Sequence, residues 1–326
     1  MRAWLVEQIT PEGTMRLAEV PVPQPKDDET LLRVEAAGLN FLDTLVARGQ
    51  YQVKPPLPFS PGVEIAGTVA AVGPGSPYQV GDRLAAPCDF GGFAEYAIAA
   101  RQGSQRLPPE MPSRDGVAML TTYPTAHLTL RKRAGMKPGD LVLVTAAAGG
   151  VGSASVQLAK HWGAKVVAAA GGADKAALCR ALGADHVIDY GVEKIVEAVR
   201  RIATAEKVDG VDIAIDSVGG ATAVDCLRCL GWQGRLMIVG FAGGSIAELP
   251  SNRLLLKNAA AMGVYWGEER RRDPALANII FKDLFGLYRA GAFRPLVRDV
   301  FKFEDAPAAV AALAARRTVG KVVIET

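Results

Sequence analysis

The sequence predicts an α/β protein in which a small β domain is followed by a doubly wound parallel sheet. Short apolar runs separated by Pro and Gly clusters fill residues 1 to about 120, as in an all-β barrel or sandwich with tight turns. From about residue 123, strand-like and helix-like segments alternate, which is typical of a parallel sheet covered on both faces. The tail, Phe301 to Thr326, returns to extended sequence ending in Lys321-Val322-Val323-Ile324. We expect this tail to rejoin the amino-terminal domain.

Length and composition fit a globular chain of about two domains. The 326 residues are 49% hydrophobic, which is ample for a sizeable core. The 37 basic and 34 acidic residues give a net charge of +3, so nothing global favours nucleic acid or an anionic membrane as a partner. The run Arg270-Arg271-Arg272 follows two glutamates and precedes an aspartate. It predicts a solvated loop rather than a nucleic-acid patch.

The sequence also bears on compartment and cysteine chemistry. No window approaches the roughly 18 apolar residues of a membrane helix, and Glu7 comes too early for a signal peptide. Four cysteines in so long a chain form no disulfide framework. Cys226 and Cys229 make a C-x-x-C inside a helical stretch without a second ligand pair. We therefore expect a cytoplasmic protein in which these two cysteines have no redox or zinc role.

The strands of the β domain are predicted at Thr30 to Val34 and Ile65 to Val72, with further short pieces after Gly81 and Gly92. A proline-rich connector follows, and Ser113 is expected to cap the helix that carries Leu120.

A glycine-rich turn is the strongest local signal. The buried strand Leu141 to Val144 enters it, and Gly149, Gly150 and Gly152 leave no side chain between the backbone and a diphosphate. The pattern is close to G-x-G-x-x-G, with Ala147 in place of the first glycine. A second buried strand, Lys165 to Ala170, completes a strand, helix, strand unit of about 30 residues. Four further strand candidates make six, the size of a full dinucleotide domain; they are His186 to Ile188, Val211 to Asp216, Leu236 to Gly240 and Ala261 to Tyr265.

The end of the second strand bears on which dinucleotide binds. An NAD-binding unit carries Asp or Glu there, to bind the ribose 2′-hydroxyl, but this chain has Gly171-Gly172. Asp174 comes later, where it can cap the next helix. Lys175 could pair with a 2′-phosphate, or it could be a solvated helix residue. We therefore expect NADPH rather than NADH.

Several motifs together resemble the medium-chain dehydrogenase/reductase superfamily, and within it the zinc-independent quinone oxidoreductases related to zeta-crystallin. They are Gly38-Leu39-Asn40-Phe41-Leu42-Asp43-Thr44, Pro61-Gly62-Val63-Glu64-Ile65-Ala66-Gly67, the turn from Ala146 to Lys160, Leu182-Gly183-Ala184-Asp185, Asp216-Ser217-Val218-Gly219-Gly220 and Gly320-Lys321-Val322-Val323. The resemblance covers essentially the whole chain. It implies a GroES-like β-barrel catalytic domain in residues 1–122 and 267–326, a Rossmann domain in residues 123–266, and a cleft between them. It also implies a homodimer formed by edge pairing of the Rossmann sheets.

The resemblance also addresses metal binding. In the zinc alcohol dehydrogenases of this superfamily, a cysteine follows the glycine corresponding to Gly38 and a histidine precedes the glutamate corresponding to Glu64. Here those places hold Leu39-Asn40 and Val63, which are not usual zinc ligands. We expect no metal. The chemistry left open is hydride delivery to an electron-poor acceptor, such as a quinone or a conjugated enone.

The resemblance places Asn40, Tyr51 and Thr125 near the nicotinamide and the acceptor, as the predicted catalytic set. Asn40 could instead cap a turn, Tyr51 could be a core ring, and Thr125 could cap a helix. Relatives often carry a second tyrosine where this chain has Leu45, so the acceptor stays open. The expected cofactor contacts are Ala148, Gly149, Gly150, Val151, Gly171, Lys175, Tyr190, Val239, Gly240, Phe241 and Arg316, with Arg317 competing for the role of Arg316.

Three functional hypotheses follow. The first is an NADPH-dependent reductase of quinones or α,β-unsaturated carbonyls, in which Tyr51 or Asn40 hydrogen-bonds the developing oxyanion. The second is an NADPH-binding protein of the same fold with a structural, sensing or RNA-binding role. The third is an enoyl thioester reductase.

Overall fold

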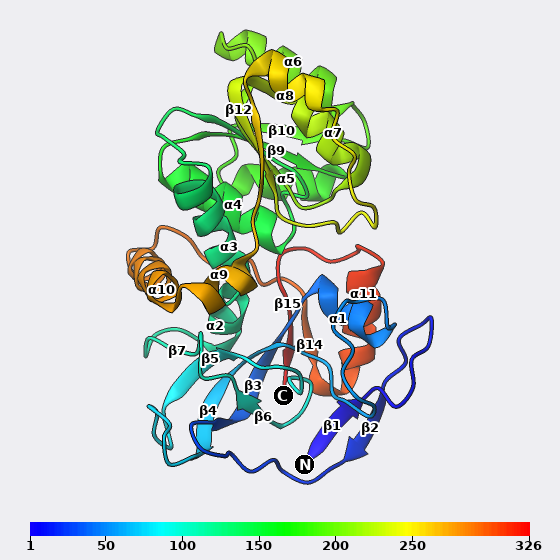
Figure 1. Ribbon diagram of the computed structural model, residues 1–326, viewed down its shortest axis with the longest axis vertical. Coiled ribbons are helices and arrows are strands. Elements are labelled where there is room, and N and C mark those ends of the chain that lie inside the picture. The colour runs from blue at the N-terminus through cyan, green and yellow to red at the C-terminus, as the bar shows by residue number, and fades with distance from the viewer. The chain divides into compact units, whose positions relative to one another are not determined.

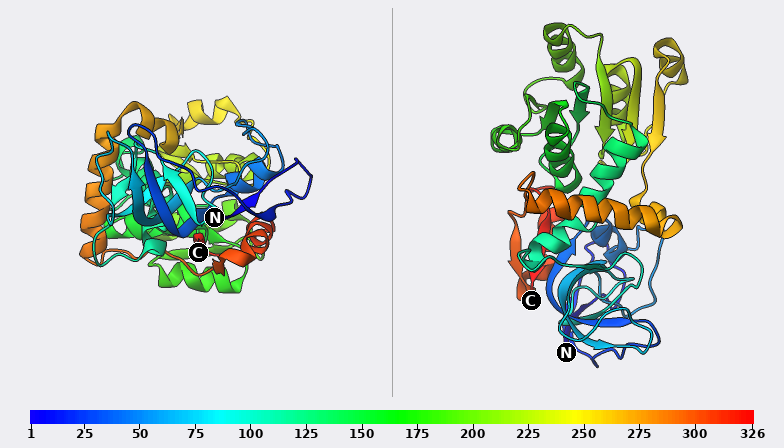
Figure 2. Two further views of the ribbon diagram at one scale, coloured as in Figure 1. Left: turned by 90° about the horizontal axis from the view of Figure 1, so that it is seen from below. Right: turned by 90° about the vertical axis from the view of Figure 1, so that its left-hand side faces the viewer.

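The computed structural model describes all residues, 1–326, and the chain forms two compact units (Figure 1). Unit 1 consists of Met1–Leu120, Arg270–Phe281 and Pro295–Thr326. Unit 2 consists of Thr121–Glu269 and Lys282–Arg294. Both ends of the chain belong to unit 1, where the two further views also show them (Figure 2).

Unit 1 is built on a seven-stranded sheet in the order β14-β15-β3-β4-β5-β7, with β6 paired to β3. A two-stranded sheet, β1-β2, adjoins it through bridges such as Ala3 to Ala94. All pairs are antiparallel except β14 with β15. The strands are β1 (Arg2–Leu5), β2 (Arg16–Glu19), β3 (Thr30–Leu39), β4 (Glu64–Val72), β5 (Arg83–Pro87), β6 (Tyr96–Ala99), β7 (Gln105–Arg106), β14 (Val300–Lys302) and β15 (Val322–Glu325).

The carboxyl-terminal strand β15 pairs with β3, with Val323 opposite Gly38, and Figure 1 shows this red strand beside the blue one. The prediction that the tail rejoins the amino-terminal domain is therefore confirmed. Strand β3 continues beyond the predicted Val34 to Leu39, because small residues there allow close pairing with both β4 and β15.

Four short helical elements lie entirely within unit 1: α1 (Phe41–Ala47), α2 (Ser113–Met119), the 3₁₀ turn η2 (Phe303–Asp305) and α11 (Ala306–Ala314). The prediction that Ser113 caps a helix is wrong. Pro112 occupies the N-cap of α2, and the Ser113 hydroxyl donates a hydrogen bond of 2.7 Å to Glu35 Oε2. A capping hydroxyl has to precede the helix and accept a backbone N–H, but Ser113 already lies in the first turn, and its hydroxyl donates to the carboxylate of Glu35.

Unit 2 contains a six-stranded, fully parallel sheet in the order β10-β9-β8-β11-β12-β13, which confirms the predicted doubly wound sheet. Helices lie on both sides of it (Figure 2, right). Its strands are β8 (Leu141–Val144), β9 (Lys165–Ala170), β10 (His186–Asp189), β11 (Val211–Asp216), β12 (Leu230–Ile238) and β13 (Ala260–Gly263). Strand β12 starts six residues before the predicted Leu236, because its pairing with β11 includes a bulge in which Gln233 adopts a φ of 57°.

The helices in the rest of the chain are α3 (Thr122–His127), the π-helical turn η1 (Leu128–Arg133), α4 (Gly150–His161), α5 (Ala173–Ala181), α6 (Ile195–Glu206), α7 (Gly220–Cys229), α8 (Ser251–Lys257), α9 (Trp266–Arg272) and α10 (Pro274–Arg289). The run Arg270-Arg271-Arg272 forms the last turn of α9, so the predicted loop is wrong. Three cations at a helix carboxyl end interact favourably with its dipole. None of the helices has the length and apolar character needed to cross a membrane.

The strand order reverses between β8 and β11. The chain runs outward from β8 through β9 to β10, then crosses back to β11 on the other side of β8. In doubly wound sheets, ligands bind at the carboxyl ends of the strands on either side of such a reversal. The turn from Thr145 to Gly149 follows β8 and therefore lies at this point.

Gly152 allows α4 to begin directly against that turn. A Cβ atom at Gly152 would lie 2.2 Å from the Ala146 carbonyl oxygen and 2.7 Å from Ala147 Cα. Both are backbone atoms, so a methyl group there forces the helix and the turn apart.

Replacing Gly152 by alanine is expected to lower the free energy of unfolding by about 1–3 kcal/mol, the usual cost of an overpacked site. The matched control is Gly286→Ala in α10, where a Cβ atom meets nothing within 4 Å. This control is expected to raise the free energy of unfolding by about 0.5–1 kcal/mol, because alanine favours the helix more than glycine does. Urea unfolding measures both. Equal stability of the two variants contradicts the packing argument.

Candidate functional site

The turn after β8 holds an unusual backbone. Ala146 has a φ of 45°, in the left-handed region, and its carbonyl accepts the Gly149 N–H at 2.8 Å. Ala147 is fully buried, and its N–H donates to the Ala169 carbonyl of β9 at 3.0 Å. The methyl group of Ala147 thus has its own space in the core. Alanine in place of the first glycine therefore leaves the turn intact, and the strained position is Ala146 rather than Ala147.

Helix α4 presents its amino terminus at this turn. Gly149 is the N-cap, and Gly149, Gly150 and Val151 are partly exposed, whereas Ala148 is buried. The first N–H groups of a helix have no intrahelical acceptors, and the helix dipole adds partial positive charge there. A diphosphate fits these groups because no side chain covers the two glycines.

Asp216 connects this turn to the next one along the sheet. Its fully buried carboxylate accepts hydrogen bonds from Thr145 Oγ1 at 2.9 Å and from the Gly219 N–H at 2.8 Å. The turns after β8 and β11 are thereby fixed to each other. In the sequence Asp216 is visible only as part of a motif, although a carboxylate that ends the apolar run Ile213-Ala214-Ile215 is a usable signal.

Val239, Gly240 and Phe241 follow β12 at the same end of the sheet. The Val239 N–H donates to the Asp216 carbonyl at 2.8 Å. Phe241 is exposed, and a Cβ atom at Gly219 would approach its ring to 2.9 Å. These three predicted cofactor residues therefore lie beside the turn that follows β11.

The ends of β9 and β10 form the other side of the candidate site. Tyr190 is exposed, and its ring lies so close to Gly171 that a Cβ atom there would be 2.6 Å from Cε2. Asp189 Oδ1 accepts the N–H groups of Gly172 and Gly191, each at 2.9 Å. These backbone bonds lower the pKa of Asp189. The sequence analysis missed Asp189, which fixes both loops around Tyr190.

Helix α5 begins at Ala173 with Gly172 as its N-cap, so the prediction that Asp174 caps it is wrong. Gly172 has a φ of 91°, which only glycine adopts readily, and this moves the helix start two residues earlier. Asp174 and Lys175 lie in its first turn.

The predicted catalytic residues are distributed over both units: Asn40 and Tyr51 belong to unit 1, and Thr125 to unit 2. Tyr51 follows α1 and packs, partly buried, against the core of unit 1. Thr125 is buried within α3, and its carbonyl accepts the Thr129 hydroxyl at 2.6 Å. Thr125 does not start this helix, so its alternative role as a helix cap is wrong.

Arg316 belongs to unit 1 and follows α11 with a left-handed φ of 57°. Arg317 is exposed beside it. The choice between these two arginines as a cofactor contact stays a prediction.

Asn40 is part of a cluster of buried polar groups at one end of unit 1. It follows β3, Glu64 begins β4, and Lys321 precedes β15, and these three strands are neighbours. Lys321 Nζ lies 2.5 Å from Glu64 Oε2 and 2.6 Å from Asn40 Oδ1. Lys321 is 4% exposed and Glu64 is 2% exposed. Gly38 leaves room for the pair, because a Cβ atom there would lie 2.8 Å from Glu64 Oε2.

Asp43 extends this cluster from α1. Its Oδ2 accepts the Asn40 backbone N–H at 2.7 Å. Burial raises the pKa of Asp43 to about 7, with the charge of Glu64 adding to the rise and the Asn40 N–H and Lys321 opposing it. The Asp43 carboxyl therefore titrates near neutral pH.

The cysteines are free thiols buried in the protein. Burial raises the pKa of Cys88, Cys226 and Cys229, so they are held as uncharged thiols. The structure contains no group of three or more His, Cys, Asp or Glu side chains arranged to hold a metal ion. The absence of a metal from the working protein stays a prediction.

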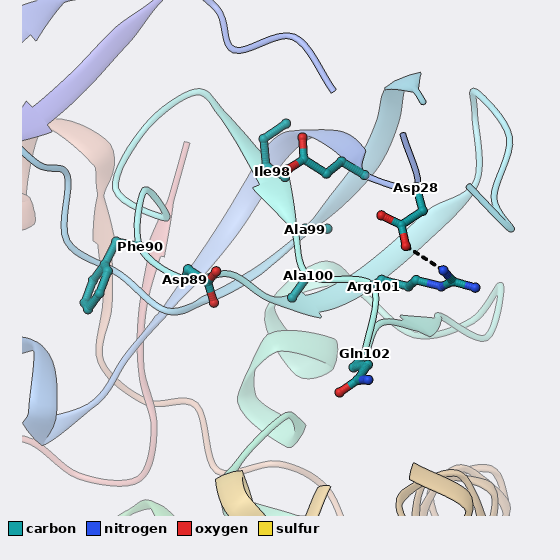
Figure 3. Close-up of a pocket in the computed structure, with 9 residues that line it drawn as sticks. Asp28, Asp89, Phe90, Ile98, Ala99, Ala100, Arg101 and Gln102 are labelled. Carbon is teal, nitrogen blue, oxygen red and sulfur yellow. Dashed lines mark hydrogen bonds and ion pairs between the residues drawn. The ribbon is translucent and has the colours of Figure 1, made fainter. Parts of the chain in front are cut away.

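Unit 1 also has a pocket of about 740 Å³, shown in Figure 3. Asp28, Glu29 and Asp89 line it, and Asp28 forms an ion pair of 2.5 Å with Arg101. None of the predicted site residues is among its lining. Because its one cation is paired and the remaining charges are negative, the pocket is poorly suited to a phosphorylated ligand.

Asp43→Asn is expected to change how stability depends on pH. The folded pKa of Asp43 is raised to about 7 from 3.8, so the folded state binds the proton more tightly than the unfolded state. The stabilisation is complete below pH 3.8 and is lost as pH rises through 7. Between pH 5 and pH 8, the free energy of unfolding of the wild type should therefore fall by about 2–3 kcal/mol more than that of Asp43→Asn. Urea unfolding at several pH values, with exposed Asp174→Asn as the control, measures this; parallel wild-type and Asp43→Asn profiles contradict it.

Comparisons with known proteins agree with this geometry. Residues 26–109 match the model of the alcohol dehydrogenase GroES-like domain, and residues 150–280 match that of the zinc-binding dehydrogenases. The chain is 40% identical over 298 residues to quinone oxidoreductase-like protein 2 of Rattus norvegicus, covering 91% of this chain and 84% of the relative.

Two solved structures extend the likeness over the whole chain. Quinone oxidoreductase from Escherichia coli, complexed with NADPH, has a TM-score of 0.90 at 27% identity, and that from Thermus thermophilus, also solved in complex with NADPH, has a TM-score of 0.83 at 34% identity. Both comparisons cover 100% of each chain. The chain belongs to the medium-chain dehydrogenase/reductase superfamily and, within it, to the quinone oxidoreductase-like family.

Proposed function

We propose that this protein is an NADPH-dependent reductase that delivers a hydride to a quinone or an α,β-unsaturated carbonyl. The observation that carries the proposal is the bare glycine turn at the strand reversal of unit 2, where the amino terminus of α4 is open to a diphosphate. The named activity of the relatives and the NADPH complexes of two neighbours support it.

The residues of unit 2 fit NADPH. Gly150 and Val151 offer backbone N–H groups to the diphosphate, and Gly149, whose own N–H donates to the Ala146 carbonyl, leaves the approach to them uncovered. Gly171 and Tyr190 form a surface for the adenosine, and Val239 to Phe241, at the same end of the sheet, would line the far end of the cofactor. When bound, the nicotinamide supplies the hydride.

The choice of NADPH over NADH rests on the loops after β9 and β10. The end of β9 carries no carboxylate to bind a ribose 2′-hydroxyl. The nearby Asp189 uses Oδ1 on two backbone N–H groups. Lys175, in the first turn of α5, supplies a positive charge for a 2′-phosphate.

The contribution of unit 1 is hydrogen bonding to the acceptor. Hydride addition to a quinone or enone places negative charge on a carbonyl oxygen, and donors aimed at that oxygen lower the barrier. Asn40 and Tyr51 of unit 1 supply an amide and a phenol for this purpose, and Thr125 of unit 2 adds a hydroxyl. At the positions of the superfamily's zinc ligands the chain has Leu39-Asn40 and Val63, so these donors take the place of a Lewis acid.

The direct test is NADPH oxidation, followed at 340 nm, with a simple quinone and with a simple enone as acceptors. We expect turnover with at least one of them and a preference for NADPH over NADH. Tight NADPH binding without turnover on either acceptor overturns the proposal and favours a binding role for the same fold.

The variant Lys175→Ala tests whether this lysine binds the 2′-phosphate of NADPH. Removing the ammonium group should raise the Kd for NADPH by roughly 10-fold and leave the Kd for NADH nearly unchanged, since a charge-assisted bond to phosphate is worth about 1.5–3 kcal/mol. Equal losses for both cofactors would show that Lys175 does not contact the 2′-phosphate.

The homodimer is also part of this proposal, with a second copy pairing along β13. This strand is the edge of the sheet, and neighbouring α8 has no buried residue. Leu255 and Leu256 are 81% and 73% exposed, and Tyr265 is exposed beyond β13. An edge strand beside exposed apolar side chains is usually covered, because it otherwise promotes aggregation.

Leu255→Glu combined with Leu256→Glu is expected to convert a dimer into a monomer in sedimentation experiments at micromolar concentration, because two buried carboxylates oppose association. The matched control is Val192→Glu, since Val192 is 85% exposed next to β10 at the opposite edge. It should leave the dimer intact. A monomeric wild type, or a double variant that stays dimeric, excludes this interface.

A further inference from the structure

We propose that Lys321, held in place by Glu64, orients the Asn40 amide so that its NH₂ group donates to the carbonyl oxygen of the acceptor. Lys321 is then a positioning residue that acts through Asn40. This inference rests on the proposed reductase function and assigns a role to two residues outside the predicted site.

The orientation of the amide follows from the chemistry of its neighbour. An ammonium group has three donors and no acceptor. Asn40 must therefore turn its oxygen towards Lys321 Nζ, at 2.6 Å, and its NH₂ group away from it. The reversed amide would place two donors against each other.

The NH₂ group so directed has no partner in the protein. Asn40 Nδ2 is shielded from solvent and makes no hydrogen bond, although the residue as a whole is only partly buried. An unpaired donor of this kind costs about 1–3 kcal/mol. A site that tolerates this cost has a use for a donor, and a carbonyl oxygen is the acceptor that the proposed substrates supply.

Three adjacent strands and one helix hold the arrangement. Glu64 on β4 fixes the ammonium group from one side at 2.5 Å, and β15 delivers Lys321 beside β3. Asp43 of α1 holds the backbone N–H of Asn40 at 2.7 Å. Both the main chain and the side chain of Asn40 are therefore fixed before any ligand binds, which is the condition for effective electrostatic stabilisation.

The redox step balances with the partners already named. NADPH gives two electrons and one proton to the acceptor as a hydride and becomes NADP⁺. The oxygen of the reduced acceptor carries the negative charge and accepts the Asn40 N–H bond. With a quinone, this oxygen then takes a proton from solvent and a hydroquinone results. With an enone, the hydride adds to the β-carbon, the α-carbon of the enolate takes a proton from solvent, and a saturated carbonyl results.

The experiment is a double-mutant cycle on kcat/KM for the acceptor. Lys321→Met should lower kcat/KM by roughly 10- to 100-fold, and the Kd for NADPH should stay unchanged. Lys321→Arg, which also has only donors, should keep most of the activity. In an Asn40→Ala background, Lys321→Met should cost less than twofold. If the combined variant loses as much kcat/KM as the product of the losses in Lys321→Met and Asn40→Ala, the proposal is overturned, because Lys321 then acts independently of Asn40.

A second variant guards against misfolding, since Lys321→Met leaves Glu64 buried without its cation. Lys321→Met combined with Glu64→Gln removes both charges of the pair and should show the same loss of kcat/KM. Activity equal to wild type in this folded variant also overturns the proposal.

A readout without turnover separates this inference from the proposed function. The chain has four asparagines, so ¹⁵N-asparagine labelling gives four side-chain NH₂ signals, and Asn40→Asp identifies one of them. With NADP⁺ bound, adding a quinone should shift the Asn40 signal in the wild type but not in Lys321→Met. If the shift occurs without NADPH turnover, the reductase function fails and the orientation of Asn40 stands. If turnover is normal and no shift occurs, the inference alone fails.

Discussion

The close approach of α4 to the turn after β8 is the constraint on which the sheet end of unit 2 depends. Only a residue without a side chain fits at Gly152, because a Cβ atom there would lie 2.2 Å from the Ala146 carbonyl oxygen. This contact fixes where the helix begins, and so where its unpaired N–H groups point. Asp216 then ties the neighbouring turn to the same place through Thr145. The geometry of the proposed phosphate site is therefore a consequence of packing.

Unit 1 depends on a different constraint, the burial of Lys321 with Glu64. Taking two charges out of water is costly, and such a pair is often no more stabilising than apolar residues of the same size. Stability alone is thus a weak reason for its presence. The pair does connect β15, β3 and β4 at one end, and it holds the Asn40 amide in one orientation. Specific placement of a donor is a better physical reason for it.

Much of the fold could be predicted from the sequence because its signals are local. Apolar strands alternating with helices predicted the parallel sheet, and Gly149 to Gly152 predicted the turn at its strand reversal. The roles of Asp189 and Lys321 could not be predicted in this way, because their partners come from distant strands: Gly172 follows β9, and Glu64 lies 257 residues from Lys321. Ser113 was assigned to a cap for the same reason, since Glu35 is remote in sequence.

Hydrogen bonding distinguishes the carboxylates that hold the fold together from the polar groups that have no partner in the protein. Asp189 holds two turns together through two backbone N–H groups, and Asp216 does so through a backbone N–H and the Thr145 hydroxyl, as structural carboxylates usually do. In contrast, Asn40 Nδ2, Asp43 Oδ1 and Glu64 Oε1 are all buried atoms without partners, and they belong to one cluster. Unpaired groups gathered in one place, beside a lysine that fixes their orientation, are what a site leaves open for a ligand. In the proposed reductase, the chemistry of unit 1 therefore centres on Asn40, while unit 2 supplies the rigid turn proposed to hold the hydride donor.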